Sequence, residues 1–225
     1  QKIKNKIMVV PRVYADELIE NSTYLNDFLM KIDSKIPIFY CGKNIVSSKS
    51  TSDELEKIGK LTSNQIIIWD NIYANDYCPQ KIFLGPWIKN YKFENIMINL
   101  TGMIETDLFL LNLISHTKQS LNHLLSWQQL LENYKLPQSF VSISKYFFPL
   151  NCQDFQNKLC YKEEIKELDF LLWRWKTPLS REWYPFLLIL KQCLQIYNND
   201  LSDERVKKIF PVPLKKTLSN FRRTQ

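Results

Sequence analysis

Four short apolar runs recur along the first half of the chain at intervals of about thirty residues. They are Ile7 to Val10, Ile36 to Tyr40, Ile66 to Trp69 and Ile96 to Ile98. The run of consecutive isoleucines is apolar on both faces, which suits a parallel strand covered by helices better than a half-exposed strand. The interval accommodates a strand, a helix and two loops, so the rhythm predicts consecutive βα units and a parallel sheet.

Helical spacing of apolar residues fills the intervals between these runs. Ala15 to Lys31 has apolar residues three and four apart, and Ser52 to Leu61 opens with a capping sequence, Ser-Asp-Glu. Ile104 to His116 closes the series as a strongly apolar helix. Four βα units are half of an eight-stranded barrel, so the pattern predicts either an open four-stranded sheet or part of a larger (β/α) barrel.

From Ser120 the strand pattern stops, and helical spacing predicts an all-α region. The expected helices are Ser120 to Tyr134, Lys162 to Lys176 and Arg181 to Tyr197. This divides the chain into βα units over 1–118, a helical region over 119–204 and a basic tail over 205–225. An aromatic group in the helical region is interpreted as a helix-packing core, with an aromatic ligand surface as the alternative; it contains Trp173, Trp175, Trp183 and Tyr184.

Charge and cysteine content narrow the classes of function. Seven of the 30 basic residues follow residue 204 with no acidic residue among them, so the 23 before them match the 23 acidic ones. We therefore expect a solvated basic tail rather than a nucleic-acid module, and no stretch is apolar enough for a membrane span. The five scattered cysteines and two histidines predict no metal site, no disulfide framework and no cofactor, and they favour a reducing compartment.

Each apolar run ends in polar or small residues, and the end of the third run is the richest. Residues 69 to 77 contain two carboxylates, two carboxamides and three aromatics. Ligands bind beyond the carboxyl ends of parallel strands, and a ring beside amide and carboxylate acceptors can hold a sugar. The alternative is a solvated turn that caps the next helix. The residues are Trp69, Asp70, Asn71, Tyr73, Asn75, Asp76 and Tyr77.

The sequence from Trp69-Asp70-Asn71 through Asn75-Asp76-Tyr77, followed by Leu84-Gly85-Pro86, resembles glycoside hydrolase family 84. This family comprises β-N-acetylglucosaminidases, the O-GlcNAcase-like enzymes among them. The similarity extends from about Met8 to His116, and it matches the four runs with the fifth to eighth strands of the family's barrel. The fold it implies is α/β: the C-terminal half of a TIM (β/α)8 barrel, followed by the all-α region.

The resemblance implies a retaining hydrolase in which the acetamide of the substrate N-acetylglucosamine attacks the anomeric carbon and forms an oxazoline, without an enzyme nucleophile. Carried over by position, Tyr14 and Trp69 shape the acetamide pocket and Asn71 binds the sugar beside it. Asp76 and Asn99 accept the outer hydroxyls. Asp70 is the neighbour of the sugar-binding Asn71, and Tyr77, Gly85 and Pro86 shape the loop.

The sequence departs from the family's pattern at the catalytic residues, and this departure leads to three functional hypotheses. The family's catalytic pair is two adjacent aspartates at the end of the fourth strand, and this chain has no Asp-Asp dipeptide. The first hypothesis is a fragment of such a glycosidase, inactive alone, with the missing N-terminal half of the barrel and the catalytic pair upstream of Gln1. The second is a non-catalytic sugar-binding or interaction protein, and the third an unrelated α/β domain with a basic tail.

Overall fold

The structure is a computed structural model, and it describes residues 23–41, 59–76, 79, 81–86, 95–119, 123–148 and 161–197. Described residues of Gln1–Ile72 and Lys89–Asn99 form one compact unit, here called the sheet unit. Those of Tyr73–Ile88 and Leu100–Gln225 form a second, called the helical unit. Several features predicted from the sequence lie outside the described residues: the run at 7–10, Tyr14, most of the helix expected at 52–61, Tyr77 and the basic tail.

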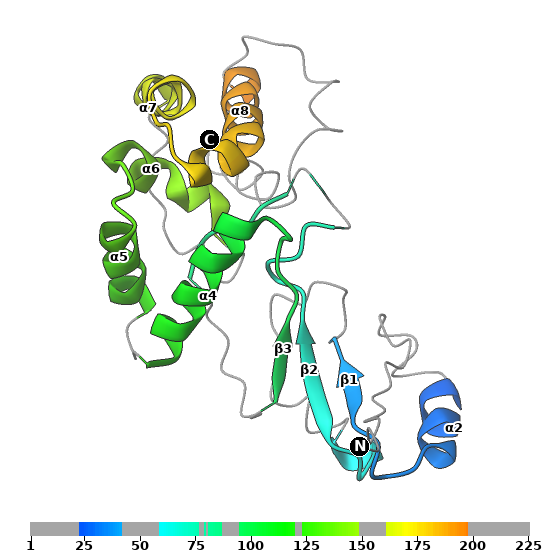
Figure 1. The fold of residues 1–225 in the computed structure, drawn as a ribbon. Helices are drawn as coiled ribbons and strands as arrows, with labels where there is room; N and C mark the ends of the chain where they lie inside the picture. Colours follow the sequence, from blue (N-terminus) through cyan, green and yellow to red (C-terminus); the bar gives the residue numbers. More distant parts are fainter. Residues whose placement is uncertain are drawn as a thin grey trace, which may run out of the picture. The chain divides into compact units, whose positions relative to one another are not determined.

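The sheet unit contains three parallel strands, β1 (Ile38–Tyr40), β2 (Ile66–Asp70) and β3 (Ile96–Ile98). They lie in the order β1-β2-β3, with β2 in the middle (Figure 1). Ile38 is in register with Ile66, and Ile68 with Ile96. The second, third and fourth apolar runs are therefore parallel strands in chain order, as the thirty-residue rhythm predicts.

One face of this sheet carries the apolar core of the unit. Side chains of alternate residues on β1 and β2 are buried there, and helix α2 (Thr23–Lys31) packs against them through Phe28 and Leu29. The strand residues in this core are Ile38, Tyr40, Ile66 and Ile68. Because residues of parallel strands that are in register point to the same side, the alternate set projects from the opposite face.

A buried asparagine fixes the start of the sheet. The side chain of Asn64, 8% exposed, donates hydrogen bonds to the carbonyls of Asp33 and Ile36, each at 2.8 Å. The adjacent backbone bond from Ile38 N to Gln65 O, at 2.9 Å, begins the pairing of β1 with β2. Asn64 thus ties the start of β2 to the turn before β1, where the Asp33 carbonyl also accepts from Ile36 N at 2.9 Å.

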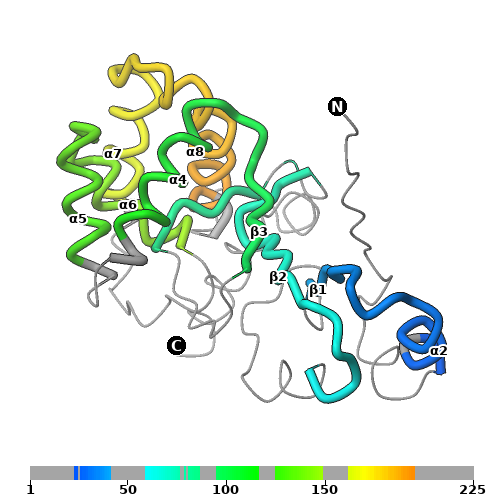
Figure 2. Tube along the Cα trace, turned by 60° about the horizontal axis from the view of Figure 1, so that its bottom comes forward, coloured from blue at the N-terminus to red at the C-terminus, as the bar shows by residue number. Residues whose placement is uncertain are grey.

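The helical unit contains α4 (Ile104–Gln119), α5 (His123–Asn133), α6 (Gln138–Ile143), a 3-10 turn (Ser144–Phe147), α7 (Tyr161–Trp173) and α8 (Pro178–Tyr197). Helix α4 packs on α5 and α8, and α7 packs on α6 and α8 (Figure 2). The short α6 has no counterpart among the predicted helices. Helix α8 begins three residues earlier than the apolar pattern predicts, because Pro178 suits the first helical turn and Thr177 Oγ1 accepts from Ser180 N at 3.1 Å.

Aromatic rings form the core of the helical unit. Trp183, 1% exposed, lies 5.4 Å from Phe109, 4.7 Å from Phe140 and 5.7 Å from Trp175 between ring centroids. Trp173 on α7 is 63% exposed instead. Two of the tryptophans at 173–183 therefore pack between helices, while Trp173 and Tyr184 remain at the surface.

A carboxylate from α8 caps the first turn of α4. Glu182 accepts hydrogen bonds from the backbone N–H groups of Glu105 at 3.1 Å and Thr106 at 2.8 Å, and from the Thr106 hydroxyl at 2.6 Å. The indole N–H of Trp183 donates to the same hydroxyl at 2.9 Å. First-turn N–H groups have no partner within their own helix, so Glu182 satisfies them and links α4 to α8.

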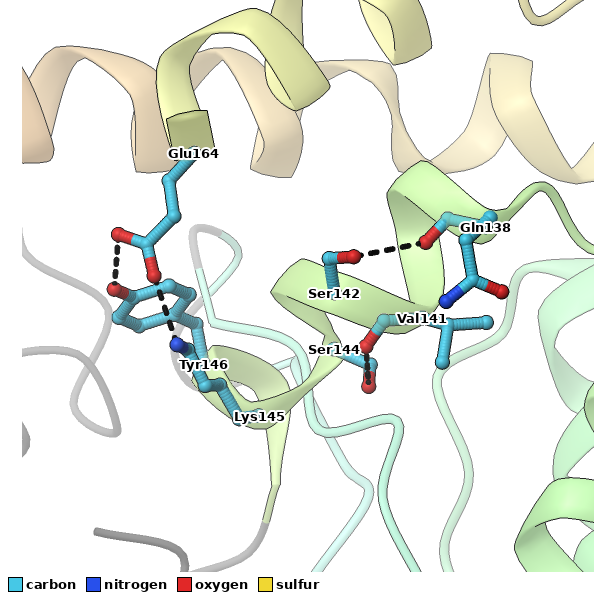
Figure 3. Close-up of polar contacts among 7 residues, drawn as sticks. All are labelled: Gln138, Val141, Ser142, Ser144, Lys145, Tyr146 and Glu164. Carbon is cyan, nitrogen blue, oxygen red and sulfur yellow. Dashed lines mark hydrogen bonds and ion pairs between the residues drawn. The ribbon is translucent and has the colours of Figure 1, made fainter. Parts of the chain in front are cut away.

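A second buried carboxylate holds the start of α7 (Figure 3). Glu164 is 5% exposed, accepts from the Tyr146 hydroxyl at 2.7 Å and pairs with Lys145 Nζ at 2.8 Å. Buried carboxylates are stable only when their oxygens are paired, and here both are. The contact ties α7 to the 3-10 turn. None of the helices in the described part of the chain combines the length and apolarity needed to cross a membrane.

Candidate functional site

The carboxyl end of β2 presents Trp69 and Asp70 to opposite faces of the sheet. Asp70 continues the buried series of Ile66 and Ile68 and is 2% exposed, whereas the half-buried Trp69 alternates with it. The alternation places Asn71 on the same face as Trp69. The face opposite α2 therefore carries an aromatic ring and a carboxamide two residues apart.

Asn71 and Asn99 are brought together by the register of β2 and β3. Asp70 pairs with Ile98, so the residues that follow each strand are neighbours. Asn99 Nδ2 donates to Asn71 Oδ1 at 3.2 Å, and Asn99 N donates to the carbonyl of Asp70 at 2.8 Å. Two side chains that are 28 positions apart in sequence thus form one carboxamide pair beyond the strand ends.

The ring of Trp69 is held on this face by its neighbours across the strands. Phe39 on β1 meets it edge to face, with ring centroids 5.8 Å apart and planes at 70°, and Met97 on β3 is its register partner. Its indole N–H is buried and donates to no acceptor among the described residues. An indole held in this way offers an apolar face and one hydrogen-bond donor.

The side chain of Asp70 stabilises the turn that follows β2. Its Oδ1 accepts a hydrogen bond from the backbone N–H of Ile72 at 2.9 Å, which is the local pattern of an Asx turn. The turn redirects the chain after β2. Asp70 is buried and, among the described residues, no helix follows it directly, so this Asx turn is not the solvated helix cap of the alternative hypothesis, while Asn71 and Asn99 pair beyond the strand ends.

Asp76 belongs to the helical unit, on a loop that begins at Tyr73. Tyr73 is fully buried, and its hydroxyl donates to the carbonyl of Gly85 at 2.9 Å. This bond closes the loop at its base, twelve residues apart. Asp76 itself is exposed within the loop, so its carboxylate is accessible to solvent and solutes.

The same loop buries a lysine that the sequence pattern did not single out. Lys81 is 1% exposed, and its Nζ lies 4.7 Å from the ring centroid of Phe83. Burial lowers the pKa of Lys81 to about 8, and the negative charge of Asp76 acts in the opposite direction. The signal in the sequence is the place of Lys81, directly before the buried apolar run Ile82-Phe83-Leu84.

The end of this loop is anchored to the 3-10 turn of the helical unit. Leu84 N donates to the carbonyl of Phe147 at 2.8 Å. A Cβ atom at Gly85 would lie 2.6 Å from Cδ1 and 2.8 Å from Cα of Phe148. Only glycine allows an approach this close, which gives Gly85 its role in shaping the loop.

Among the described residues there is neither a thiol that is ionised at neutral pH nor a group of metal-ligating side chains. Cys41 follows β1, and burial raises the pKa of its thiol to about 11, so it is not a thiolate at neutral pH. Burial likewise raises the pKa of Cys193 on α8 to about 12. Within the described residues, no three His, Cys, Asp or Glu side chains are grouped as metal ligands.

Comparisons with known proteins agree on one family. The chain is 33% identical over 69 residues to protein O-GlcNAcase of Rattus norvegicus and, equally, to that of Mus musculus. Each match covers 31% of this chain and 8% of the relative, so the chain spans a small part of these proteins.

A solved structure shares the fold. A mutant of the O-GlcNAc hydrolase of Thermobaculum terrenum superposes with a TM-score of 0.62 at 17% identity, over 90% of this chain and 53% of that one. The model of the β-N-acetylglucosaminidase family matches residues 1–135, which is more than half of the chain and contains the Trp69, Asn71 and Asn99 positions. The chain is thus a member of the β-N-acetylglucosaminidase family.

Proposed function

We propose that this chain contributes the sugar-recognition part of a glycoside hydrolase that acts on terminal N-acetylglucosamine. The observation that carries the proposal is the Asn71–Asn99 carboxamide pair, joined at 3.2 Å on the face that also carries Trp69. Carboxamides can both donate to and accept from an acetamide and ring hydroxyls, while an indole packs on the apolar face of a sugar. Family membership supplies the independent support.

Each residue takes the role that the family resemblance implies. Trp69 and Tyr14 would line the acetamide pocket, and Asn71 would bind beside that group. Asn99 and Asp76 would accept the outer hydroxyls. The three strands of the sheet unit would be the sixth to eighth of a closed (β/α)8 barrel.

The proposed chemistry is substrate-assisted: the acetamide oxygen forms an oxazoline while one carboxylate polarises the acetamide and another protonates the leaving oxygen. The family's adjacent aspartates have no counterpart as a dipeptide in these 225 residues. We therefore assign recognition to this chain and proton transfer to a segment outside it. The same absence supports the second candidate, a non-catalytic protein that binds the sugar alone.

Calorimetry with N-acetylglucosamine tests recognition, which both candidates share. We expect saturable binding, weaker binding of glucose because it lacks the acetamide, and affinity about 10- to 100-fold lower in Asn71→Ala, the loss of one or two buried hydrogen bonds. Asn112→Ala, an exposed carboxamide on α4, is the matched control and should leave the affinity unchanged. Equal affinity for the two sugars, or an unchanged affinity in Asn71→Ala, would remove the proposal.

Turnover of a chromogenic β-N-acetylglucosaminide separates the two candidates. The glycosidase candidate predicts hydrolysis only when a segment carrying the aspartate pair is present with this chain. Sugar binding without hydrolysis in that combined protein would leave the binding protein as the function.

A further inference from the structure

The turn between α7 and α8 exposes two aromatic rings, although the helical unit buries most of its other rings. The two helices pack against each other and are joined by residues 174–177 (Figure 1). Trp173, the last residue of α7, is 63% exposed, and Tyr184 on α8 is 37% exposed. An indole left in water forgoes the free energy of burial, and tryptophan and tyrosine are enriched at binding surfaces.

Three exposed basic side chains lie in the same stretch of chain, and no acidic one lies among them. Between residues 170 and 181 the charged residues are Arg174, Lys176 and Arg181. In the described part of the chain neither guanidinium is paired with a carboxylate. Lys176 Nζ donates to the carbonyl of Leu172 at 3.2 Å. These cations and the two rings are here called the α7–α8 corner: Trp173, Arg174, Lys176, Arg181 and Tyr184.

Most acidic side chains of the two helices are engaged within the fold. Glu164 is paired at the start of α7, and Asp169 pairs with Lys191. Glu182 accepts hydrogen bonds from the first turn of α4. The other two glutamates of α7 lie in its first two turns, away from the corner. The α7–α8 corner therefore keeps its positive charge.

Arg181 has no stabilising role in its own helix. It lies in the first turn of α8, and that turn contains no acidic residue. The positive end of the helix dipole disfavours a cation at this end, whereas cations near the end of α7 are favoured. The dipole thus accounts for Arg174 and Lys176 but not for Arg181. An anionic partner would offset the repulsion between Arg181 and the start of α8.

We propose that the α7–α8 corner is a docking site for an acidic, extended peptide segment of a partner protein. Arginine binds carboxylates through parallel N–H groups, so Arg174 and Arg181 suit aspartate and glutamate side chains. Trp173 and Tyr184 supply apolar contact beside these charges, and tryptophan, tyrosine and arginine dominate the binding energy of interfaces. The inference goes beyond the proposed function, because it requires no sugar.

A peptide fits the charge distribution better than a nucleic acid does. Nucleic-acid-binding domains carry a basic excess along a face that follows the phosphate backbone. Here 23 basic residues balance 23 acidic ones before residue 205, and the local excess at the corner comes from three side chains. An excess this small matches a few carboxylates rather than a run of phosphates.

Fluorescence anisotropy with a labelled peptide of glutamate and serine around one phenylalanine tests docking on the full chain. We expect saturable binding that weakens as salt is added, because exposed charges are screened. Trp173→Ala should weaken binding about tenfold, the loss of an aromatic hot spot. Arg174→Gln combined with Arg181→Gln should weaken it about five- to tenfold, the loss of two exposed charge pairs.

Lys162→Gln combined with Lys166→Gln is the matched control. It removes the same charge from exposed positions in the first two turns of α7 and should leave the affinity unchanged. The seven basic residues after residue 204 are present in every variant, so a difference between variants belongs to the corner. Circular dichroism of each variant verifies that it is folded.

Three results would overturn the proposal. They are absence of peptide binding, equal affinities of the arginine and lysine double variants, and unchanged affinity in Trp173→Ala. Tighter binding of a single-stranded oligonucleotide or of phosphatidylserine vesicles, weakened by the same substitutions, would assign the corner to phosphate ligands and overturn the peptide as its partner. The probe carries no sugar, so these results are separate from the outcome with N-acetylglucosamine.

Discussion

Replacing Trp183 with alanine is expected to lower the free energy of unfolding by about 3–5 kcal/mol, the range for removing a large aromatic side chain from a core. Trp183 is 1% exposed and touches the rings of Phe109 on α4, Phe140 on α6 and Trp175 between α7 and α8, so its loss leaves a cavity among these elements. It also leaves the Thr106 hydroxyl without the donor now at 2.9 Å. Chemical denaturation followed by circular dichroism measures the change.

Trp173→Ala is the matched control for this experiment, because its side chain is 63% exposed on α7. We expect it to change the free energy of unfolding by no more than about 0.5 kcal/mol, as for other surface positions. Equal losses in the two variants would contradict the assignment of Trp183 to the core and of Trp173 to the surface.

Gly85→Ala is expected to cost about 1–3 kcal/mol, the range for forcing an extra carbon into a packed region. The added Cβ would lie 2.8 Å from the Cα of Phe148, and a backbone atom cannot move aside by a simple rotamer change. The Leu84–Phe147 backbone bond at 2.8 Å lies next to this contact and should weaken with it. Thermal denaturation measures the loss, and hydrogen exchange of the Leu84 amide locates it.

Gly59→Ala provides the control for the Gly85 substitution. Gly59 is exposed and lies in a helical segment, and among the described residues no atom outside its chain neighbours and its own helix backbone lies within 4 Å of the position of a new Cβ. Alanine there restricts the unfolded chain and should stabilise the protein by about 0.4–1 kcal/mol. A stabilised Gly85→Ala would show that the approach of Phe148 is not as close as described.

The strands could be predicted from sequence because their signal is local. The apolar runs at 36–40, 66–69 and 96–98 are strands β1, β2 and β3 within two residues, and their even spacing predicts the parallel order. Short elements without a full period of apolar residues could not be predicted in this way. Helix α6 has six residues and follows Pro137, and its stability comes from burial of Phe140 and Ile143 against other helices.

Part of the candidate site could likewise be predicted from local sequence patterns, and part of it could not. Asn71 and Asn99 each follow a strand, and the rule that parallel strands end at one edge is enough to bring them together. The burial of Lys81 was not predicted, because its place before the apolar run Ile82-Phe83-Leu84 is the only local signal, and the Tyr73–Gly85 hydrogen bond that closes the loop joins residues twelve positions apart. The reason for glycine at position 85 is likewise a contact with Phe148, far along the chain.

The most direct test of sugar recognition is an NMR titration of the protein with N-acetylglucosamine, observing side-chain N–H signals. The account predicts saturable shifts of the carboxamide signals of Asn71 and Asn99, and of the indole signal of Trp69, whose N–H is buried without an acceptor among the described residues. Glucose should shift them less at equal concentration. If these three signals stay unmoved while the sugar binds elsewhere, or not at all, the recognition site is not at the ends of β2 and β3.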